Sequence, residues 1–513
     1  MRIQSFLLGE WQDNHRTVAS AHCALDGTVI AEQAGVDVNG GETLDFARTV
    51  GGPALRSMTY LQRAELLHQV ASILVANKAQ YYALSAQNNG ATQTDSLLDI
   101  EGGIGTLKYY ASLGKKIGNR TWLSHGESEP ITKHDNFRGI HVKTPLRGVA
   151  IHINAFNFPA WGMLEKLGVA LLSGVPVVVK PASVTLPVAY AMARDIVAAE
   201  ILPIGTFSFL AGGGRDLLDY ITSQDTVAFT GSADTAGLLK SHPRVISESV
   251  RFNVEADSIN SAILGPDIEL GSVGFKSFIR EVCNEMTVKS GQKCTAIRRI
   301  FVPRELLEEA KSALIEKLSK ASIGDPAIEG VTYGPLVSKV QLNAAQEGVG
   351  QLLKEAELAF EGDIQQLKGD ENGFYVTQKL LVCRDPANAK NVHSTEVFGP
   401  VATLMPYESH NQLFDLVRAG GGSLVSSIFT NDDQFAFGAV AELGSSHGRL
   451  LIVDESISRG HSGHGNVMPM CIHGGPGRAG GGQELGGLRG MDFYHVCTAV
   501  QTNLSRAAYL QGD

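Results

Sequence analysis

The segment GVAIHINAFNFPAWGMLEKLGVALLSGVPVVVKPAS, residues 148–183, decides the fold. It holds a short apolar run at 148–153, a longer apolar stretch at 161–172 and a second short run at 175–179. Short buried runs on either side of a helix-length stretch are typical of a parallel sheet. A right-handed crossover then places both strands in one sheet. The segment therefore predicts a strand-helix-strand unit.

The same alternation continues along the chain. A helical stretch is predicted at 187–199, followed by apolar strand-like runs at 207–210 and 227–229. Together these elements predict an α/β fold with a doubly wound sheet of the nucleotide-binding kind. Ligands of such sheets bind at the carboxyl ends of the strands.

Polar residues follow three of these predicted strands. They form Asn154-Ala155-Phe156-Asn157-Phe158-Pro159, Lys180-Pro181-Ala182-Ser183 and Phe229-Thr230-Gly231-Ser232. Taken singly, each has a structural explanation as a turn, a strand exit or a helix cap. Three sets of amide, ammonium and hydroxyl donors at successive strand ends instead indicate a site for an anionic or carbonyl ligand.

A thiol stands out in the second half of the chain. This half begins near Asn260, with strands predicted at 261–264, 298–302, 374–376 and 401–404. Within it, Ser290-Gly291-Gln292-Lys293-Cys294-Thr295-Ala296 places one cysteine among small and polar residues before an apolar strand. We interpret Cys294 as a nucleophile, because a thiolate attacks a carbonyl carbon readily. The alternative is a small buried apolar residue.

The remaining segments have simpler patterns. Residues 41–113 are predicted to be helical, 121–142 to form an exposed extended arm, and 492–496 to pair as an edge strand. The literal Gly-x-Gly-x-x-Gly at 475–480 is interpreted as a loop, because no strand is predicted before it. His461 and His464 are interpreted as exposed loop residues without a metal. The expected core of the first helical region comprises Leu61, Ala64, Leu67, His68, Val70, Ala71 and Leu74.

Composition excludes several function classes. The 513 residues carry a net charge of −10 and no dense Lys/Arg tract, so neither a nucleic acid nor an anionic membrane is an expected partner. No segment has the length and apolarity of a signal peptide or a membrane span, which predicts a cytoplasmic protein. The six scattered cysteines lack metal-ligand spacing and are expected to be reduced thiols.

Taken in order, the motifs resemble the aldehyde dehydrogenase superfamily along essentially the whole chain. The segments that carry the resemblance are 157–159, 180–181, 229–232, 291–294, 396–400 (Glu-Val-Phe-Gly-Pro) and 482–486 (Gly-Gln-Glu-Leu-Gly). The glycine-rich run 474–489 also resembles a subgroup that oxidises semialdehydes of coenzyme A thioesters. The expected substrate is therefore a small aldehyde, and within that class an acyl-CoA semialdehyde.

The resemblance implies a domain layout. It predicts a Rossmann-like cofactor domain (1–120 and 144–257, with 466–489 returning to it), an α/β catalytic domain (258–465) and a small β oligomerisation arm (121–143 and 490–505). The expected assembly is a homodimer or a homotetramer.

The resemblance also implies catalytic roles. Cys294 forms a thiohemiacetal and then a thioester, and Asn157 with the Cys294 backbone N–H stabilises the oxyanion. Glu255, 294 − 255 = 39 residues before the thiol, is the expected hydrolytic base, and a buried carboxylate with a raised pKa would suit that task. Asp257 is the competing base. Glu484 matches a second family carboxylate that relays protons, and whether it or Glu255 dominates deacylation stays open.

The predicted cofactor is NADP in preference to NAD. Ser183 stands where the family commonly has a Glu that binds the adenosine ribose, so a neutral residue beside Lys180 leaves room and charge for a 2′-phosphate. By resemblance, Gly231 and Ser232 meet the pyrophosphate, and Glu396 with Phe398 meets the nicotinamide ribose and ring. Ala236 departs from the usual Gly.

Three other functions compete with aldehyde oxidation as an explanation of the sequence. A cysteine hydrolase would pair Cys294 with a histidine such as His152 or His393, which leaves Lys180 and Glu396 unexplained. A coenzyme A-acylating reductase would dispense with Glu255. A binding protein that reuses the fold would tolerate loss of the whole catalytic set.

Overall fold

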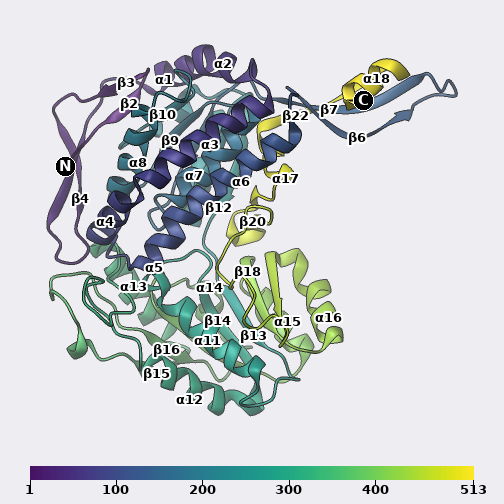
Figure 1. The fold of residues 1–513 in the computed structure, drawn as a ribbon. Helices are drawn as coiled ribbons and strands as arrows, with labels where there is room; N and C mark the ends of the chain where they lie inside the picture. Colours follow the sequence, from purple (N-terminus) through teal and green to yellow (C-terminus); the bar gives the residue numbers. More distant parts are fainter. Residues whose placement is uncertain (513) are drawn as a thin grey trace.

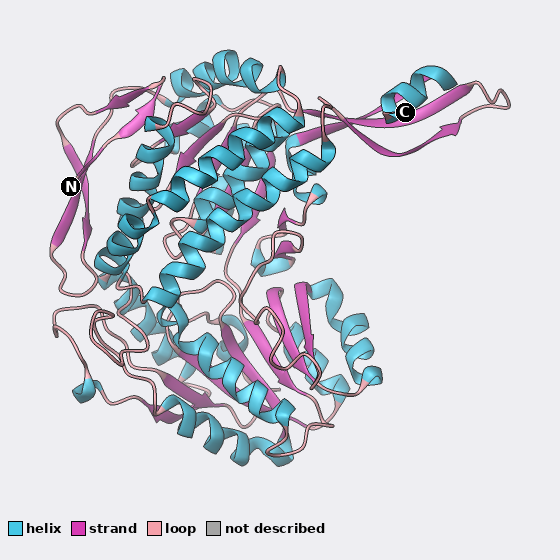
Figure 2. Cartoon of the chain, in the orientation of Figure 1, coloured by secondary structure: helices cyan, strands magenta, loops and turns pink. Residues whose placement is uncertain are grey.

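The computed structural model describes residues 1–512, and over this range the chain is built on two seven-stranded sheets (Figures 1 and 2). The first sheet has the order β12-β11-β8-β9-β10-β2-β3, in which β8 to β12 run parallel and β2 and β3 are antiparallel. Its strands are β2 (Ser5–Leu7), β3 (Glu10–Gln12), β8 (Ala150–Ile153), β9 (Val177–Lys180), β10 (Phe207–Phe209), β11 (Thr226–Thr230) and β12 (Arg251–Glu255).

The predicted strand-helix-strand unit is confirmed. β8 pairs with β9 from Ala150↔Val177 to Ile153↔Lys180, and α7 (Trp161–Ser173) connects them. Helix α7 ends at Gly174, whose φ of +89° suits a residue without a Cβ. The valines of β9 are fully buried, as expected for a strand covered on both faces.

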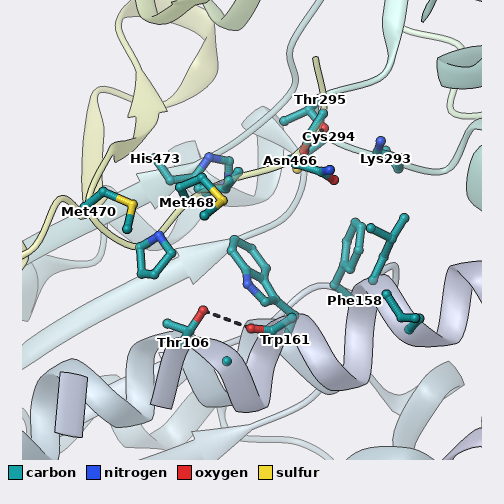
Figure 3. A pocket seen from close by; sticks show the side chains of 17 residues that line it. Thr106, Phe158, Trp161, Lys293, Cys294, Thr295, Asn466, Met468, Met470 and His473 are labelled. Atoms are coloured by element: carbon teal, nitrogen blue, oxygen red, sulfur yellow. Dashed lines mark hydrogen bonds between the residues drawn. The ribbon is translucent and has the colours of Figure 1, made fainter. Parts of the chain in front are cut away.

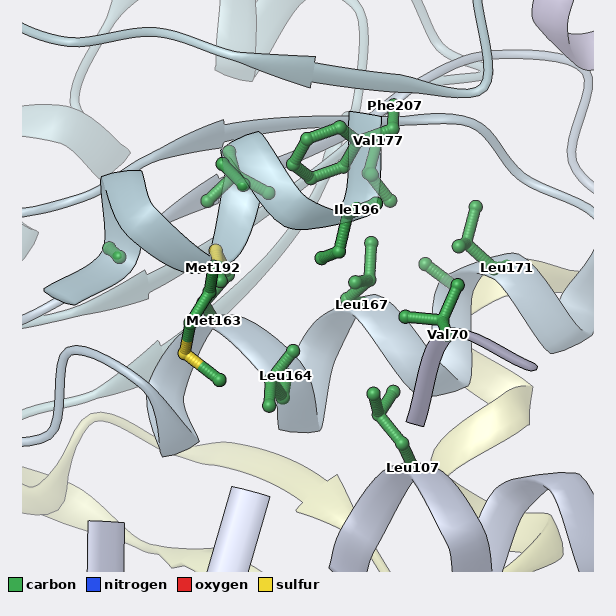
Figure 4. Close-up of a cluster of buried hydrophobic side chains, with 14 of the residues drawn as sticks. Val70, Leu107, Met163, Leu164, Leu167, Leu171, Val177, Met192, Ile196 and Phe207 are labelled. Carbon is green, nitrogen blue, oxygen red and sulfur yellow. The ribbon is translucent and has the colours of Figure 1, made fainter. Parts of the chain in front are cut away.

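Long helices cover this sheet and form the largest hydrophobic core (Figure 4). The helices α3 (Tyr60–Ala76), α6 (Gly102–Ile117), α7 and α8 (Leu186–Ala198) contribute most of its side chains. A capping box starts α3: Thr59 accepts from the N–H of Gln62, and the Gln62 side chain accepts from the N–H of Thr59. Two predicted core residues of α3, Leu61 and His68, are instead exposed, because they lie on the outer face of the helix.

The second sheet has the order β15-β16-β17-β14-β13-β18-β19. Its strands are β13 (Asn260–Leu264), β14 (Ile297–Pro303), β15 (Glu357–Glu361), β16 (Lys379–Val382), β17 (Val401–Tyr407), β18 (Ser423–Phe429) and β19 (His447–Val453). The strand predicted at 374–376 was wrong, because β16 begins only at Lys379. The backbone of Phe374 bonds to two loop residues, Ala24 and Leu336, rather than to a strand.

Helices flank this sheet and connect its strands. The main ones are α11 (Val273–Thr287), α12 (Leu307–Leu318), α13 (Lys339–Leu352), α14 (Asn391–Ser394), α15 (His410–Arg418) and α16 (Asp433–Leu443). The remaining α-helices are α1 (Gly40–Phe46), α2 (Gly52–Arg56), α4 (Lys78–Asn89), α5 (Gln93–Ser96), α9 (Ala233–Lys240), α10 (Pro243–Ser247), α17 (Leu488–Met491) and α18 (Leu504–Gln511). Helices α1 to α6 confirm the helical prediction for 41–113.

A three-stranded arm projects from the body of the molecule (Figure 1). It consists of β6 (Leu123–Pro130), β7 (Phe137–Pro145) and β22 (His495–Asn503), with α18 beside it. The extended arm is therefore confirmed. The edge strand predicted at 492–496 begins only at His495, because Asp492–Tyr494 form a 3-10 turn.

Two small sheets complete the described residues. One joins β1 (Arg2–Ile3), β5 (Val29–Ala34) and β4 (Thr17–His22), and the other is the hairpin of β20 (Ile472–Gly475) and β21 (Gly482–Leu485). The glycine motif at 475–480 forms the loop of this hairpin, so the loop interpretation holds although a short strand does precede it.

Candidate active site

Cys294 lies on the wall of an apolar cavity of about 350 Å³ (Figure 3). Helix α6, helix α7 and the 465–473 segment form most of its wall. The lining residues are Leu97, Leu98, Gly102, Gly105, Thr106, Phe158, Trp161, Lys293, Cys294, Thr295, Gly465, Asn466, Val467, Met468, Pro469, Met470 and His473. Such a lining suits a ligand with an apolar chain and one reacting polar end.

The thiol segment has an unusual backbone. Lys289, Ser290 and Gly291 adopt successive φ values of +52°, +55° and +69°, a region that residues with a Cβ rarely occupy. Hydrogen bonds hold them there: the Lys289 N–H donates to Asp95 at 2.7 Å, and the Ser290 hydroxyl donates to the Gly334 carbonyl at 2.7 Å. This constrained turn holds Cys294 at the cavity wall.

Cys294 itself is partly exposed to the cavity. Burial raises the pKa of its thiol well above the ordinary value, and the neighbouring negative charge of Glu255 adds to the effect. The thiol therefore keeps its proton until another group or a bound ligand changes the local charge. The other five cysteines form no disulfide either, as expected for reduced thiols.

Glu255, at the end of β12, lies beside the thiol and beside His473 of β20. One carboxylate oxygen of Glu255 is 2.9 Å from Nε2 of His473, and both side chains are at most 3% exposed. Burial alone would raise the pKa of Glu255, but His473, with Lys166 and the Cys294 thiol, lowers it to about 2. Glu255 is therefore buried, as suits a hydrolytic base, and its surroundings lower its pKa rather than raise it.

A buried ammonium links Glu255 to Glu484. Nζ of Lys166 lies 2.6 Å from Glu165 and 3.0 Å from Glu484, and each of the three side chains is at most 8% exposed. Oxygens of Glu165, Glu255 and Glu484 lie within 4.8 Å of one another. Burial raises the pKa of Glu165, whereas the surrounding carboxylates raise the pKa of Lys166 in spite of its burial.

Asn157 follows β8 and is 9% exposed. It lies with Ser290 and Gln292 on the wall of a cavity of about 20 Å³. Asn157 and the thiol segment therefore lie on the wall of the same small cavity. Asp257, the competing base, instead accepts from the N–H of Ala233 at 3.2 Å and lies 3.4 Å from Arg478, which places it at the start of α9.

The predicted cofactor residues lie at strand ends of the first sheet. Lys180 ends β9 and Ser183 begins the next turn, both partly buried, and burial lowers the pKa of Lys180. Gly231 and Ser232 follow β11, and the Ser232 hydroxyl accepts from the N–H of Thr235 to cap α9. A Cβ at Gly231 would lie 2.5 Å from the Phe229 ring, so a larger residue would have to displace that ring. The departure at Ala236 is accommodated, because its methyl group packs in a small apolar cluster.

Glu396 and Phe398 approach from the second sheet. Burial raises the pKa of Glu396 to about 7, although Arg298, at 3.7 Å, opposes the shift. The Phe398 ring packs edge-on against Phe156, with ring centroids 5.6 Å apart, and the Arg298 guanidinium lies over its face.

Buried polar atoms without a partner occur at strand ends of the first sheet and at Glu396. Within residues 1–512, both side-chain amide atoms of Asn154, the hydroxyl of Thr230 and one carboxylate oxygen of Glu396 have no hydrogen-bond partner. Such atoms are costly unless a ligand or water satisfies them. Together with the Ser232 helix start, they fit a polar, phosphate-bearing cofactor such as a nicotinamide dinucleotide.

The histidines of the rival functions lie elsewhere. His152 faces Tyr494, with 3.2 Å between Nε2 and the phenol oxygen, and His393 contacts Arg299.

His464 was predicted to be exposed but is fully buried, because its ring bonds to Ser427 and its backbone to Glu281. The histidine that lies within 4.8 Å of the Cys294 sulfur, in one group with Glu255, is His473.

Comparisons with known proteins agree with this geometry. Residues 11–500 match the model of the aldehyde dehydrogenase family. The chain is 44% identical to 3,4-dehydroadipyl-CoA semialdehyde dehydrogenase of Aromatoleum evansii over 479 residues, which is 93% of each chain.

Two solved structures share the fold. One is 3,6-anhydro-L-galactose dehydrogenase, with a TM-score of 0.84 and 22% identity, covering 98% of this chain and all of that one. The other is an NAD⁺ complex of aldehyde dehydrogenase from Bacillus cereus, with a TM-score of 0.84 and 24% identity, covering 98% of this chain and 97% of that one. Among the residues described, no helix has the length and apolarity to cross a membrane. The chain belongs to the aldehyde dehydrogenase family, and it is an oxidoreductase that acts on aldehydes.

Proposed function

We propose that the protein oxidises an aldehyde to a carboxylic acid, with NADP as cofactor, through a thiohemiacetal and a thioester on Cys294. The observation that carries the proposal is the position of the thiol: Cys294 lies at the wall of an apolar cavity and within 4.8 Å of the ionised carboxylate of Glu255.

The chain's own groups account for each step. The thiol proton of Cys294 passes to the neighbouring carboxylate of Glu255, Sγ bonds to the aldehyde carbon, and the carbonyl oxygen becomes an oxyanion that Asn157 and the Cys294 N–H stabilise. A bound nicotinamide cofactor would supply the hydride acceptor. The carbonyl then re-forms as a thioester. Glu255, once it has passed its first proton on, takes a proton from a water molecule, the water oxygen bonds to the acyl carbon, and the C–S bond breaks to release the acid and a thiolate. The thiolate takes one proton back from Glu255, so each turnover releases one proton.

Lys166 and Glu484 are proposed to carry that proton away. Glu484 is 3.0 Å from Lys166, and Lys166 contributes to the low pKa of Glu255. The buried group therefore connects the base to a second carboxylate, which also accepts from Asn253 at 3.0 Å.

The preference for NADP rests on Lys180 and Ser183. The ammonium of Lys180 donates only to the carbonyl of its neighbour Pro181, at 3.3 Å, and Ser183 brings no negative charge to the start of the next turn. A 2′-phosphate can therefore bind both side chains, whereas a carboxylate at 183 would repel it. Ser232 and Gly231 are proposed to contact the pyrophosphate, and Glu396 and Phe398 the nicotinamide ribose and ring.

The proposed substrate is 3,4-dehydroadipyl-CoA semialdehyde, oxidised to 3,4-dehydroadipyl-CoA in aerobic benzoate degradation. The 44% identity to a dehydrogenase of that name supports it. The apolar lining of the cavity also favours a broader function, as a medium-chain aldehyde dehydrogenase. A semialdehyde dehydrogenase of phenylacetate catabolism is the third candidate.

We further propose the domain division expected from the sequence, with the first sheet binding the cofactor, the second carrying Cys294, and the arm pairing copies into a dimer or a tetramer. The protruding three-stranded arm supports this assignment.

The test measures NADPH formation with hexanal and with the acyl-CoA semialdehyde. Glu255→Gln is expected to keep most of the single-turnover hydride step and to lose steady-state turnover, and Asp257→Asn serves as the matched carboxylate control. Equal loss of both steps in Glu255→Gln would exclude the hydrolytic role. A higher kcat/KM for hexanal than for the thioester would favour the medium-chain function.

A further inference from the structure

Three side chains from separate segments bring different donor atoms together around one point. Sγ of Cys294, a carboxylate oxygen of Glu255 and a ring nitrogen of His473 all lie within 4.8 Å of one another. Glu255 ends β12, His473 lies in β20 and Cys294 precedes β14. Sequence spacing gives no sign of the group, because 473 − 255 = 218 residues separate two of its members.

Two of the three ligand side chains, Glu255 and His473, are buried and form no well-aligned hydrogen bond among residues 1–512. The side chains of His473 and Glu255 are 3% and 2% exposed. Among residues 1–512, neither carboxylate oxygen of Glu255 has a hydrogen-bond partner, and neither does Nε2 of His473. The 2.9 Å contact between them therefore lacks the alignment of a hydrogen bond.

Thiolate, imidazole and carboxylate are the ligands that zinc prefers in proteins. Bond lengths of about 2.0–2.3 Å place neighbouring ligand atoms of a tetrahedral site about 3.3–3.8 Å apart. The present separations, from 2.9 Å up to a limit of 4.8 Å, bracket that range, so side-chain rotations of about 1 Å complete the geometry. Three protein ligands leave the fourth position open toward the apolar cavity.

A second group of possible ligands is already occupied. The carboxylates of Glu165, Glu255 and Glu484 also converge within 4.8 Å. However, the ammonium of Lys166 lies 2.6 Å from Glu165 and 3.0 Å from Glu484. Since that cation already compensates these charges, the second group has no need of a metal.

We propose that Cys294, His473 and Glu255 form a binding site for a borderline-soft divalent cation, for which Zn²⁺ is the probe. The metal bonds to Sγ of Cys294 and displaces its proton to solvent, with no change of oxidation state. Because the same atoms include the proposed nucleophile and base, the metal-bound enzyme cannot oxidise an aldehyde. The site acts as a reversible block that also shields the thiol from alkylation and oxidation.

Neighbouring residues that are not themselves ligands contact His473 and Glu255. The ring of Trp161 packs edge-on against His473, with 5.5 Å between ring centroids. The backbone of Glu255 accepts from the N–H of Gly231 at 3.1 Å. Such neighbours fix ligand orientation and tune metal affinity.

The experiment uses the full chain carrying Cys471→Ser and Cys497→Ser, because both of these thiols are exposed and would bind metal on their own. Neither residue belongs to the proposed machinery, so basal activity is expected to stay unchanged. Zn²⁺ binding is measured by competition with a chromophoric chelator. Cobalt is then substituted, because a thiolate-to-cobalt absorption band reports the Sγ bond. The expected results are one equivalent of metal, loss of activity and full recovery with EDTA.

Variants of the three ligands, made in the chain that carries Cys471→Ser and Cys497→Ser, distinguish a three-ligand site from binding by the thiol alone. His473→Phe keeps a ring against Trp161, and Glu255→Gln keeps the side-chain shape. Each is expected to weaken Zn²⁺ by more than the roughly 10- to 100-fold that loss of a supporting neighbour causes. Cys294→Ser is expected to abolish the cobalt-thiolate band.

A second measurement does not depend on activity. Bound Zn²⁺ should slow alkylation of Cys294 by iodoacetamide, followed by mass, and His473→Phe should remove that protection. Unchanged Zn²⁺ affinity in both His473→Phe and Glu255→Gln would reduce the site to the thiol, and binding that survives Cys294→Ser would place the metal elsewhere. Either result overturns the proposal. Activity with hexanal in metal-free buffer tests the proposed function separately.

Discussion

Gly105 offers a direct test of where the substrate chain lies. This residue sits on α6 and lines the cavity of about 350 Å³ beside Cys294. A Cβ built at Gly105 meets no atom within 4 Å, so the position has open space into which the side chain of a leucine can extend. Its four side-chain carbons would take up space that otherwise holds the apolar chain of an aldehyde.

The expected effect follows from the free energy of burying methylene groups. Each CH₂ transferred from water contributes about 0.8 kcal/mol, which corresponds to about a fourfold change in kcat/KM. If leucine excludes two to four chain carbons, Gly105→Leu loses about 1.6–3.2 kcal/mol, or roughly 15- to 200-fold, with octanal. Propanal reaches the thiol without filling the cavity, so its kcat/KM is expected to change less than about twofold.

The assay measures NADPH formation across a series of linear aldehydes from propanal to octanal. Gly350→Leu is the matched control, because Gly350 also lies in a helix, α13, with no atom within 4 Å of its Cβ, and it lines none of the cavity. Both changes replace a helical glycine, so any general gain in helix stability cancels. An equal loss for propanal and octanal, or an unchanged value for octanal, would refute a substrate path along α6.

Three further predictions concern charges. Lys166→Met should lower the free energy of unfolding, measured in urea, by about 3–5 kcal/mol, because it leaves buried carboxylates without their cation. Adding Glu165→Gln should recover part of this loss. An unchanged free energy of unfolding would show that Lys166, Glu165 and Glu484 carry no net charge to balance. The KM for NADP should rise as the pH falls through about 7, because Glu396 takes up a proton in that range and then accepts fewer hydrogen bonds from the cofactor. Glu396→Gln should remove this dependence of KM on pH. Ser183→Glu should shift the ratio of kcat/KM values from NADP toward NAD by about 10- to 150-fold, and a constant ratio would remove Ser183 from cofactor selection.

Local patterns predicted the first sheet well. The apolar runs of β8 and β9 are continuous because both faces of these strands are covered, and this pattern is readable within a few residues. The aromatic run at 374–376 looked equally strand-like. Its backbone bonds to Ala24 and Leu336, which are distant in sequence, so tertiary contacts decided its conformation. The burial of His464 could not be predicted from local pattern either, because it depends on contact with Ser427 of β18.

The active-site residues also fall into those that a local motif predicts and those that only tertiary contacts reveal. Cys294 and Glu255 were found because their motifs resemble those of a known family. His473 and Lys166 belong to no motif that points to chemistry, and their importance comes from distances of 2.9 Å to Glu255 and 3.0 Å to Glu484. The direction of the pKa shift of Glu255 could not be read from the sequence for the same reason: it depends on His473 and Lys166, which no motif brings to the carboxylate.

The β20–β21 hairpin makes the active site depend on the order of synthesis. Its strands span residues 472–485, and they supply His473 to Glu255 and Glu484 to Lys166. A nascent chain that has folded its first sheet still lacks both partners until residues 473–484 have been made, which at about 5–20 residues per second leaves a long interval for the early half to fold first. During that interval the base and the buried ammonium are unbalanced, so a chain truncated before the hairpin is expected to be both unstable and inactive. The competence of the thiol is thereby coupled to the synthesis of the hairpin.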